Sequence, residues 1–333
     1  MKYNDAIDAV ITWVDGNDEH HRKKRNDALR NDQYSNESDL KSGKDNTRFV
    51  ESGELFYCIL SIRKFAPWIG KIYLVTDNQV PEFLDNDFQL RYDISIIDHT
   101  VIFRDFEWAL PTFNTRSIEM ALWRIPGLSD NFIYFNDDFV LTSPVDKSDF
   151  FDKGKIVLKG NWKPIRHYGP IRMGLNNLFS IAAKRFMGVT RSMHLLLQIR
   201  SAELAGFTNQ YFRVPHVPYP VRKPVLKKFF GKNPGLFEKN IEYKFRSTEQ
   251  FSAIFLADHL EIKDNNAVLR APEGVMTLHG ELDTFFILKQ KLERINQGRI
   301  TYLSLQGFES FKKGQQESIK KCLDMTLRLI DVE

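Results

Sequence analysis

The sequence is poor in cysteine and has no long apolar run, and both shortages limit where the protein can work. Its 333 residues include only two cysteines, Cys58 and Cys322, so nothing calls for the disulfides of an oxidising compartment. No segment approaches the roughly 18 apolar residues of a membrane span. The first residues, 1–5, lack the apolar core of a signal peptide. We therefore expect a cytoplasmic protein and keep peripheral attachment at the inner face of the membrane open.

The chain also lacks a strong excess of charge and the standard catalytic motifs. Lys plus Arg number 47 and Asp plus Glu number 43, which leaves a net charge of +4. The whole molecule is therefore no strong polyanion binder, and we expect no nucleic-acid partner. Walker loops, G-x-G-x-x-G, G-x-S-x-G and zinc-ligand spacings are all missing. Any site must be inferred from less standard patterns.

Apolar runs alternate with helical patterns over the first 140 residues. Strands are expected at 7–14, 71–76, 94–97 and 132–135, and helices at 51–65 and 115–123, the latter capped by Asn114 or Thr115. A surface helix and then a mobile loop are expected within 17–47. This order predicts an α/β fold with a mostly parallel, doubly wound sheet of the GT-A or Rossmann-like type.

The second half of the sequence is less regular, and we expect it to contribute a helical, basic C-terminal part. Residues 214–224 carry four prolines and are expected to form an extended loop. Residues 222–246 hold eight Lys or Arg against two Glu. A strand is expected at 156–158, and further helices are expected at 181–206, 247–260, 281–296 and 308–330.

Two acidic clusters directly follow expected strands. Asp15 follows the first strand, and Asp137 and Asp138 follow the fourth. Ligands of doubly wound sheets bind beyond the carboxyl ends of the strands. Adjacent carboxylates there can hold Mg²⁺ or Mn²⁺, which prefers oxygen ligands and commonly bridges to a substrate pyrophosphate. A solvated turn is the plainer interpretation of one acidic pair, but two clusters at strand ends favour a site.

The segment Trp13-Val14-Asp15-Gly16 is a weaker motif. A glycine after the acid allows a ligand to approach the backbone closely, or simply permits a tight turn. The Trp13 ring is of a kind that stacks on a base, although a tryptophan in the core is commoner.

His216 is the main candidate for a general base. It lies between Pro215 and Pro218, so a stiff loop presents its imidazole, as a base with a pKa near the working pH requires. The plainer interpretation is a surface histidine. His194 falls in a helical pattern and is not a candidate, whereas His279 follows an apolar strand and is held in reserve.

Arginines become important if the substrate carries phosphate, because a guanidinium makes permanently charged, bidentate contacts. Arg246 is well placed, just before an expected helix that Ser247 would cap, with Gln250 completing a capping box. Further candidates are Arg116, Arg166 and Arg172.

Taken together, these segments resemble the Stealth family of hexose-1-phosphate transferases, which includes bacterial capsule polymerases and the animal N-acetylglucosamine-1-phosphotransferase. The resemblance covers roughly residues 7–260. Its motifs are the segment 7–16, then Arg48-Phe49, Glu54-Leu55, Ser61-Ile62, 66–68, 72–76, 110–114, Ile118-Glu119 and 134–138, and finally 216–220, 245–247 and Glu249-Gln250. The sequence departs from the family pattern at Leu60, where an Arg is common, and at 302–307, where relatives often carry an Asn-Asp pair.

The resemblance implies a reaction and a set of roles. An acceptor hydroxyl attacks the β-phosphorus of a UDP-sugar, which we expect to be a UDP-N-acetylhexosamine, and UMP leaves. The acceptor is an oligosaccharide or capsular polysaccharide. Mg²⁺ or Mn²⁺ would be held by Asp137 and Asp138. The catalytic set would be His216, Asp15, Arg246 and Asp138, with His216 and Asp15 both open as the base. Donor contacts are assigned to Trp13, Val14, Gly16, Asn114, Arg116 and Arg172.

This implies a nucleotide-sugar-binding catalytic domain over 1–220 and, over 221–333, a basic and helical part that completes the active site on the acceptor side. Two other functions stay open at this point. One is a metal-dependent GT-A glycosyltransferase that releases UDP. The other is a non-catalytic protein that binds a polyanion or an anionic membrane surface through residues 222–246.

Overall fold

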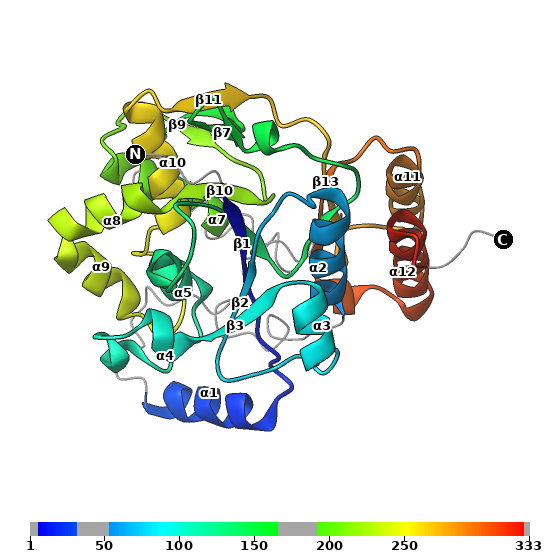
Figure 1. Ribbon diagram of the computed structural model, residues 1–333, viewed down its shortest axis with the longest axis horizontal. Helices are drawn as coiled ribbons and strands as arrows, with labels where there is room; N and C mark the ends of the chain where they lie inside the picture. Colours follow the sequence, from blue (N-terminus) through cyan, green and yellow to red (C-terminus); the bar gives the residue numbers. More distant parts are fainter. Residues whose placement is uncertain (1–5, 32–52, 166–191, 330–333) are drawn as a thin grey trace, which may run out of the picture.

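A five-stranded sheet forms the centre of the protein, in the order β10-β4-β1-β2-β3 (Figure 1). The computed structural model describes residues 6–31, 53–165 and 192–329. Four of the strands are parallel and β10 is antiparallel to β4, which confirms the predicted mostly parallel sheet. The strands are β1 (Ile7–Thr12), β2 (Ile72–Thr76), β3 (Ile94–Asp98), β4 (Asn131–Asn136) and β10 (Tyr219–Arg222).

The order of these strands places a topological switch point between β1 and β4. From β1 the chain builds β2 and β3 on one side, and then returns across β1 to build β4 on the other. Ligands of open α/β sheets bind at such a point, in the crevice outside the carboxyl ends of the strands. The connecting helices are α1 (Glu19–Asn31), α2 (Glu54–Phe65), α3 (Asn86–Arg91), α4 (His99–Ile102) and α5 (Thr115–Ala121).

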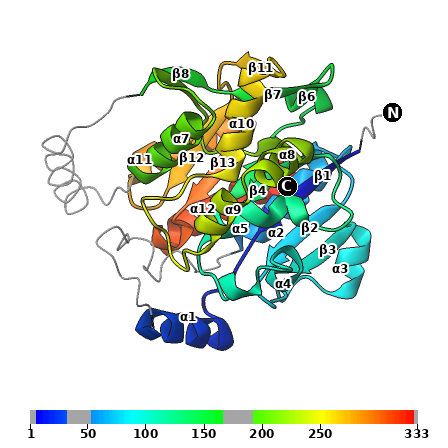
Figure 2. The same cartoon turned by 90° about the vertical axis from the view of Figure 1, so that its left-hand side faces the viewer.

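The rest of the described chain adds smaller sheets and more helices around this centre (Figure 2). The sheets have the orders β11-β7-β6, β12-β13-β5 and β8-β9. Their strands are β5 (Phe139–Leu141), β6 (Phe151–Asp152), β7 (Lys155–Lys159), β8 (Asn161–Pro164), β9 (Gln210–Arg213), β11 (Ala267–Arg270), β12 (Val275–His279) and β13 (Tyr302–Gln306). The helices are α7 (Ser192–Leu204), α8 (Lys223–Lys232), α9 (Pro234–Ile241), α10 (Ala253–Lys263), α11 (Phe285–Asn296) and α12 (Lys313–Leu327).

Short 3-10 turns complete the described elements, at Glu107–Ala109, Leu122–Arg124, Lys147–Asp149 and Phe308–Ser310. The C-terminal part therefore holds strands as well as the expected helices. Strand β11 pairs with β7 and β13 pairs with β5, so strands from before and after residue 220 share sheets.

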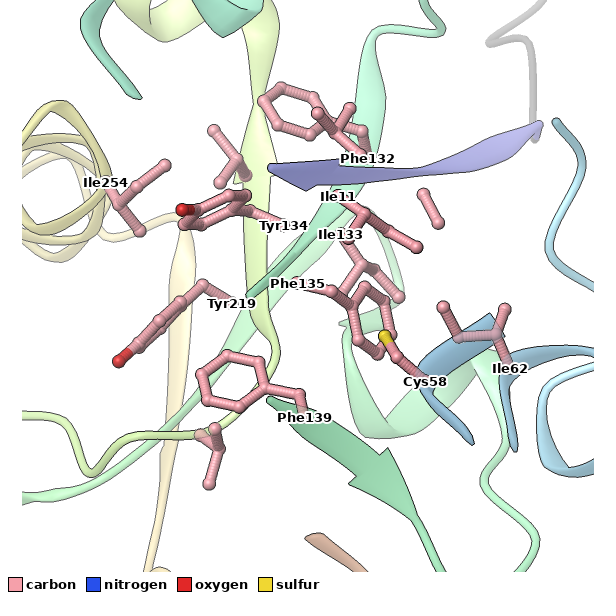
Figure 3. Packing of buried hydrophobic residues seen from close by; sticks show 14 of the residues in the cluster. Ile11, Cys58, Ile62, Phe132, Ile133, Tyr134, Phe135, Phe139, Tyr219 and Ile254 are labelled. Carbon is pink, nitrogen blue, oxygen red and sulfur yellow. The ribbon is translucent and has the colours of Figure 1, made fainter. Parts of the chain in front are cut away.

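Aromatic side chains fill the space where β4, β5 and β10 meet (Figure 3). Tyr134, Phe135 and Phe139 are at most 1% exposed, and Tyr219 is 4% exposed. Tyr134 and Tyr219 stack with ring centroids 6.3 Å apart, and Phe139 meets Tyr219 edge-on at 5.9 Å. These rings fix the strand end that carries the acidic pair against the strand that follows His216.

Two of the sequence predictions are wrong. The extended loop expected over 214–224 contains β10, because Pro220 lies in an edge strand, where a missing N–H group is tolerated. The helix expected from residue 247 begins only at Ala253. Ser247 does donate its backbone N–H to Gln250 Oε1 (3.1 Å), but this half of a capping box closes a loop.

Other expectations hold or lie outside the described residues. Asn114 caps α5, since the N–H of Arg116 donates to its Oδ1 (3.2 Å). The expected mobile loop after α1 and residues 181–191 of the expected helix are not among the described residues. In the described ranges, Cys58 and Cys322 are free and buried, and no helix has the length and apolar character needed to cross a bilayer.

Candidate functional site

The two acidic clusters lie at the same edge of the central sheet. Strands β1 and β4 are parallel neighbours in a register that pairs Thr12 with Asn136. Asp15 follows the end of β1 and Asp137 follows the end of β4, so both leave the sheet at its carboxyl edge, at the switch point. The structure therefore brings the two acidic clusters to one edge of the sheet, as the sequence suggested.

His216 joins the acidic pair at this edge. Its Nε2 lies 3.3 Å from Asp138 Oδ2 and 3.4 Å from Asn136 Nδ2. A carboxylate accepts and an amide NH₂ donates, so Nε2 has a partner whether or not it carries the proton. Nδ1 lies 3.4 Å from the hydroxyl of Tyr219. The imidazole can thus take up and release a proton at Nε2 without losing its orientation.

Two aromatic rings pack against His216. Phe139 meets it edge-on at a centroid distance of 4.5 Å and His194 at 5.9 Å. Burial lowers the pKa of His194 to about 3, so this second imidazole is neutral in the working range. His194 therefore acts as a packing partner of His216, as its helical context in the sequence indicates.

Acceptor oxygens at the end of β4 lack partners in the described part of the chain. Asn136 Oδ1 and Asp138 Oδ1 are buried and make no hydrogen bond there. A buried acceptor without a partner is costly, and a divalent cation would satisfy oxygens of this kind. The described residues contain no group of three or more His, Cys, Asp or Glu arranged to hold a metal. The two unpartnered oxygens are of the kind that Mg²⁺ or Mn²⁺ prefers as ligands, so these residues fit such a cation.

A chain of polar groups connects the strand ends behind the site. The hydroxyls of Thr12 and Tyr134 lie 2.9 Å apart, and Tyr134 donates to Glu119 Oε1 (3.3 Å). Ser252 donates to the other carboxylate oxygen of Glu119 (3.2 Å). Burial raises the pKa of Glu119 to about 7, against the opposing effect of these hydrogen bonds. These hydrogen bonds link β1, β4, α5 and the start of α10.

Arg246 lies on a loop that wraps around the first turn of α5. One of its guanidinium nitrogens, Nη2, lies 3.3 Å from Thr115 Oγ1. Helix α5 runs into the 3-10 turn that precedes β4, so it is antiparallel to that strand and begins at the carboxyl edge of the sheet. Arg246 is half-buried and stands near the edge that carries the acidic pair, which suits its predicted contact with phosphate.

Asn114 and Arg116 hold this loop rather than line an open surface. Asn114 is fully buried, and its Nδ2 approaches Tyr243 O (3.0 Å), Phe245 O (2.8 Å) and Gln250 Oε1 (2.9 Å). Arg116 is 4% exposed and donates to Ser247 O (2.7 Å). Their predicted donor contacts stay predictions, and these bonds favour a positioning role for both.

Asp15 is held by the loop that follows the neighbouring strand β2. Its backbone N–H donates to Gln79 Oε1 (3.0 Å), Gln79 Nε2 donates back to Asp15 O (2.8 Å), and the N–H of Asn17 donates to Asp15 Oδ1 (2.8 Å). No hydrogen bond links Asp15 to His216 among the described residues. Of the two candidate bases, His216 is the one that contacts the acidic pair.

The other residues predicted to contact the UDP-sugar differ in how exposed they are. Val14 and Gly16 are half-buried beside Asp15, where a ligand can reach them. Trp13 is 6% exposed and belongs to the hydrophobic core, so its predicted contact would need the ring to be uncovered. Arg166 and Arg172 lie outside the described residues.

The basic segment does not run along the site edge. Strand β10 is antiparallel, so it ends beside the start of β4, with Arg222 paired to Asn131. Lys223 begins α8 there, and its N–H donates to Asp130 O (2.8 Å). The lysines of α8 therefore start from the opposite edge of the sheet, and α9 carries the chain back toward Arg246.

Some groups near the site were not singled out from the sequence. Gln79 and Tyr219 lie in ordinary loop and strand contexts, and Glu119 appeared only within a matched motif. Strand β13 also supports the site, because the N–H of Leu305 donates to Asp138 O (2.9 Å). A carboxylate among apolar helix residues was the one available signal for Glu119, and such a residue is usually solvated.

Comparison with known proteins identifies two conserved regions. Residues 5–33 match the family model described as Stealth protein CR1, conserved region 1. Residues 48–158 match Stealth protein CR2, conserved region 2. The matched ranges contain Asp15, Asn114, Glu119 and the Asp137–Asp138 pair.

Curated relatives extend the similarity over most of the chain. The chain is 30% identical over 320 residues to the receptor polysaccharide phosphotransferase WefC of Streptococcus gordonii, covering 88% of this chain and 91% of that one. It is 32% identical over 271 residues to the capsular polysaccharide phosphotransferase fcs1 of Haemophilus influenzae, covering 79% and 67%. Among solved structures, mouse xyloside xylosyltransferase 1 aligns at 10% identity with a TM-score of 0.38, covering 90% and 97%.

Replacing Asn114 by alanine tests its anchoring role. Asn114→Ala removes the cap of α5 and the contacts of its Nδ2 with Tyr243 O, Phe245 O and Gln250 Oε1, which should lower the free energy of unfolding by about 2–4 kcal/mol. Urea unfolding followed by circular dichroism measures this. Thr115→Ala, which removes a single half-buried contact, is the matched control and should cost less than about 1 kcal/mol. Unchanged stability together with lost donor binding would show that Asn114 is a ligand contact instead.

Proposed function

Because the chain belongs to the Stealth family and is a phosphotransferase, we propose that it moves a hexose-1-phosphate from a UDP-sugar to a hydroxyl of a growing capsular polysaccharide and releases UMP. The observation that carries this proposal is the contact between His216 and Asp138 at the carboxyl edge of β4. It places a proton acceptor beside an acidic pair that fits a cation. A UDP-N-acetylhexosamine is the proposed donor.

The proposed chemistry has one bond forming and one breaking at phosphorus. The acceptor oxygen bonds to the β-phosphorus, and the bond from that phosphorus to the oxygen bridging to the α-phosphorus breaks. The bridging oxygen leaves with UMP. His216 takes the hydroxyl proton at Nε2, and Asp138 stabilises the imidazolium that results. The product keeps the anomeric oxygen and the transferred phosphate as a phosphodiester.

Neutralising the phosphates requires positive charge near the site. Asp137 and Asp138 would hold Mg²⁺ or Mn²⁺, together with the unpartnered oxygen of Asn136, and the bound ion would offset charge on the pyrophosphate. Arg246 binds a phosphate oxygen beside the start of α5, where its guanidinium is oriented by Thr115. Asp15, fixed by Gln79, orients the donor at the neighbouring strand end.

The released nucleotide distinguishes this function from glycosyl transfer on a similar sheet. Incubation with a panel of UDP-sugars, Mg²⁺ and an oligosaccharide acceptor should release UMP in step with product, detected by ion-exchange chromatography. Release of UDP in step with product would instead mean attack at the anomeric carbon, and would favour the metal-dependent glycosyltransferase. A reaction without acceptor controls for hydrolysis of the donor.

Removing either carboxylate of the pair tests the metal role. Asp137→Asn and Asp138→Asn should each lower transfer at least 10²-fold, because a bound cation contributes several kcal/mol to the transition state. Both should also weaken binding of Mn²⁺ to the protein, followed by electron paramagnetic resonance. The exposed Glu273→Gln is the matched control. If both variants bind Mn²⁺ and catalyse transfer like wild type, Asp137 and Asp138 do not hold a catalytic metal.

The assignment of His216 as the general base is tested by its effect on kcat rather than on substrate affinity. His216→Ala should lower kcat by about 10²–10⁴ with a modest change in KM for the UDP-sugar, since proton transfer is needed only in the transition state. His20→Ala, exposed on α1, is the histidine control and should keep its kcat. If His216→Ala keeps its kcat and only the acceptor KM rises, Asp15 becomes the better candidate for the base.

A further inference from the structure

A cavity of about 370 Å³ opens beside the loop that carries Arg246. Its volume falls within the range of small-molecule sites. Helices α7 and α9 and the loop after α9 line it, with Arg200, Leu236, Lys239, Tyr243, Glu249 and Phe251. The reaction proposed above makes no use of these side chains.

The lining combines groups that recognise a charged sugar. Tyr243 donates to Glu249 Oε2 (2.8 Å), which fixes the ring and leaves the other carboxylate oxygen to accept from a ligand hydroxyl. Leu236 and Phe251 add apolar surface. Arg200 makes no hydrogen bond or ion pair within the described part of the chain, so its guanidinium is available to an anion. A planar guanidinium suits a phosphodiester, which it can contact bidentately.

Two elements connect this cavity directly to the active site. On α7, the ring of His194 contacts His216, and Arg200 follows six residues later, about 9 Å farther along the helix axis. On the loop, Arg246 lies between Tyr243 and Glu249 in sequence. The cavity and the site therefore share α7 and the loop that carries Arg246, an arrangement that suits binding of adjacent units of one chain.

We propose that this cavity binds a sugar-phosphate unit of the acceptor, next to the unit that carries the attacking hydroxyl. Arg200 contacts the phosphodiester, Glu249 accepts from a sugar hydroxyl, and Phe251 and Tyr243 contact the less polar side of the ring. This inference rests on the proposed function, because a phosphodiester-linked acceptor is the product of earlier transfers. It gives the enzyme a preference for its own polymer.

The proposal differs from a track of surface lysines along residues 222–246. Lys227 and Lys228 are exposed on α8, which starts at the edge of the sheet opposite to the acidic pair. Lys239 lines the cavity and is already paired with Glu242. Binding of a phosphodiester in the cavity should therefore depend on Arg200, and the α8 lysines provide a matched control.

Binding without donor tests the cavity independently of catalysis. The probes are synthetic oligosaccharides of one to three N-acetylhexosamine units joined by 1-phosphodiesters, titrated into the full chain by calorimetry. Wild type should bind the three-unit probe at least tenfold more tightly than the one-unit probe. Arg200→Ala should lose this advantage, since a hydrogen-bonded charge contact is worth about tenfold or more, and Arg200→Lys should restore part of it. A Lys227→Ala, Lys228→Ala double variant should bind like wild type.

Kinetic measurements with the same acceptors distinguish a loss of binding in the cavity from general damage to the active site. Arg200→Ala should raise KM for the three-unit acceptor about tenfold, while kcat and KM for the one-unit acceptor stay unchanged. The proposal is overturned if wild type shows no preference for length, or if Arg200→Ala retains that preference. Transfer that releases UDP, or no transfer at all, would overturn the proposed function, whereas the binding result would still decide the cavity.

Discussion

The parallel pairing of β1 with β4 is the constraint on which the site depends. The two strands are far apart in sequence, and their register places Thr12 beside Asn136. That register brings the turn holding Asp15 and the turn holding Asp137 to one edge. The hydroxyl contact between Thr12 and Tyr134 fixes the same two strands from the side chains, so a slip in register would separate the acidic clusters and break a buried polar contact.

Around this pairing, each group that we propose to act in catalysis is held by another element. Strand β10 returns from the His216 loop along β4, β13 supports Asp138 through its backbone, and the loop after α9 carries Arg246 to the start of α5. Catalysis of phosphoryl transfer is mostly positioning and charge stabilisation. A site assembled from several elements and a dense aromatic core suits that requirement, because each group is fixed before the substrate arrives.

Much of the sheet could be predicted from sequence, and less of the site. Buried parallel strands are almost continuously apolar, so 72–76 and 132–135 stand out as strands and the acids after them as strand-end groups. The contact between His216 and Asp138 could not be predicted from spacing, because 78 residues separate them. The prolines around His216 also led us to expect a loop where β10 pairs with β4. The late start of α10 was missed because Asn114 and Asn240 hold residues 243–251 as a loop through long-range bonds that local pattern does not reveal.

The central claim is that this edge of the sheet directs attack to phosphorus and leaves the anomeric carbon untouched. It is tested most directly with a UDP-sugar carrying ¹⁸O at the oxygen between the anomeric carbon and the β-phosphorus. If transfer occurs at phosphorus, the label stays with the sugar and appears in the phosphodiester of the product, where it shifts the ³¹P resonance. Label found in the released nucleotide would show that the carbon–oxygen bond had broken, and would contradict the account.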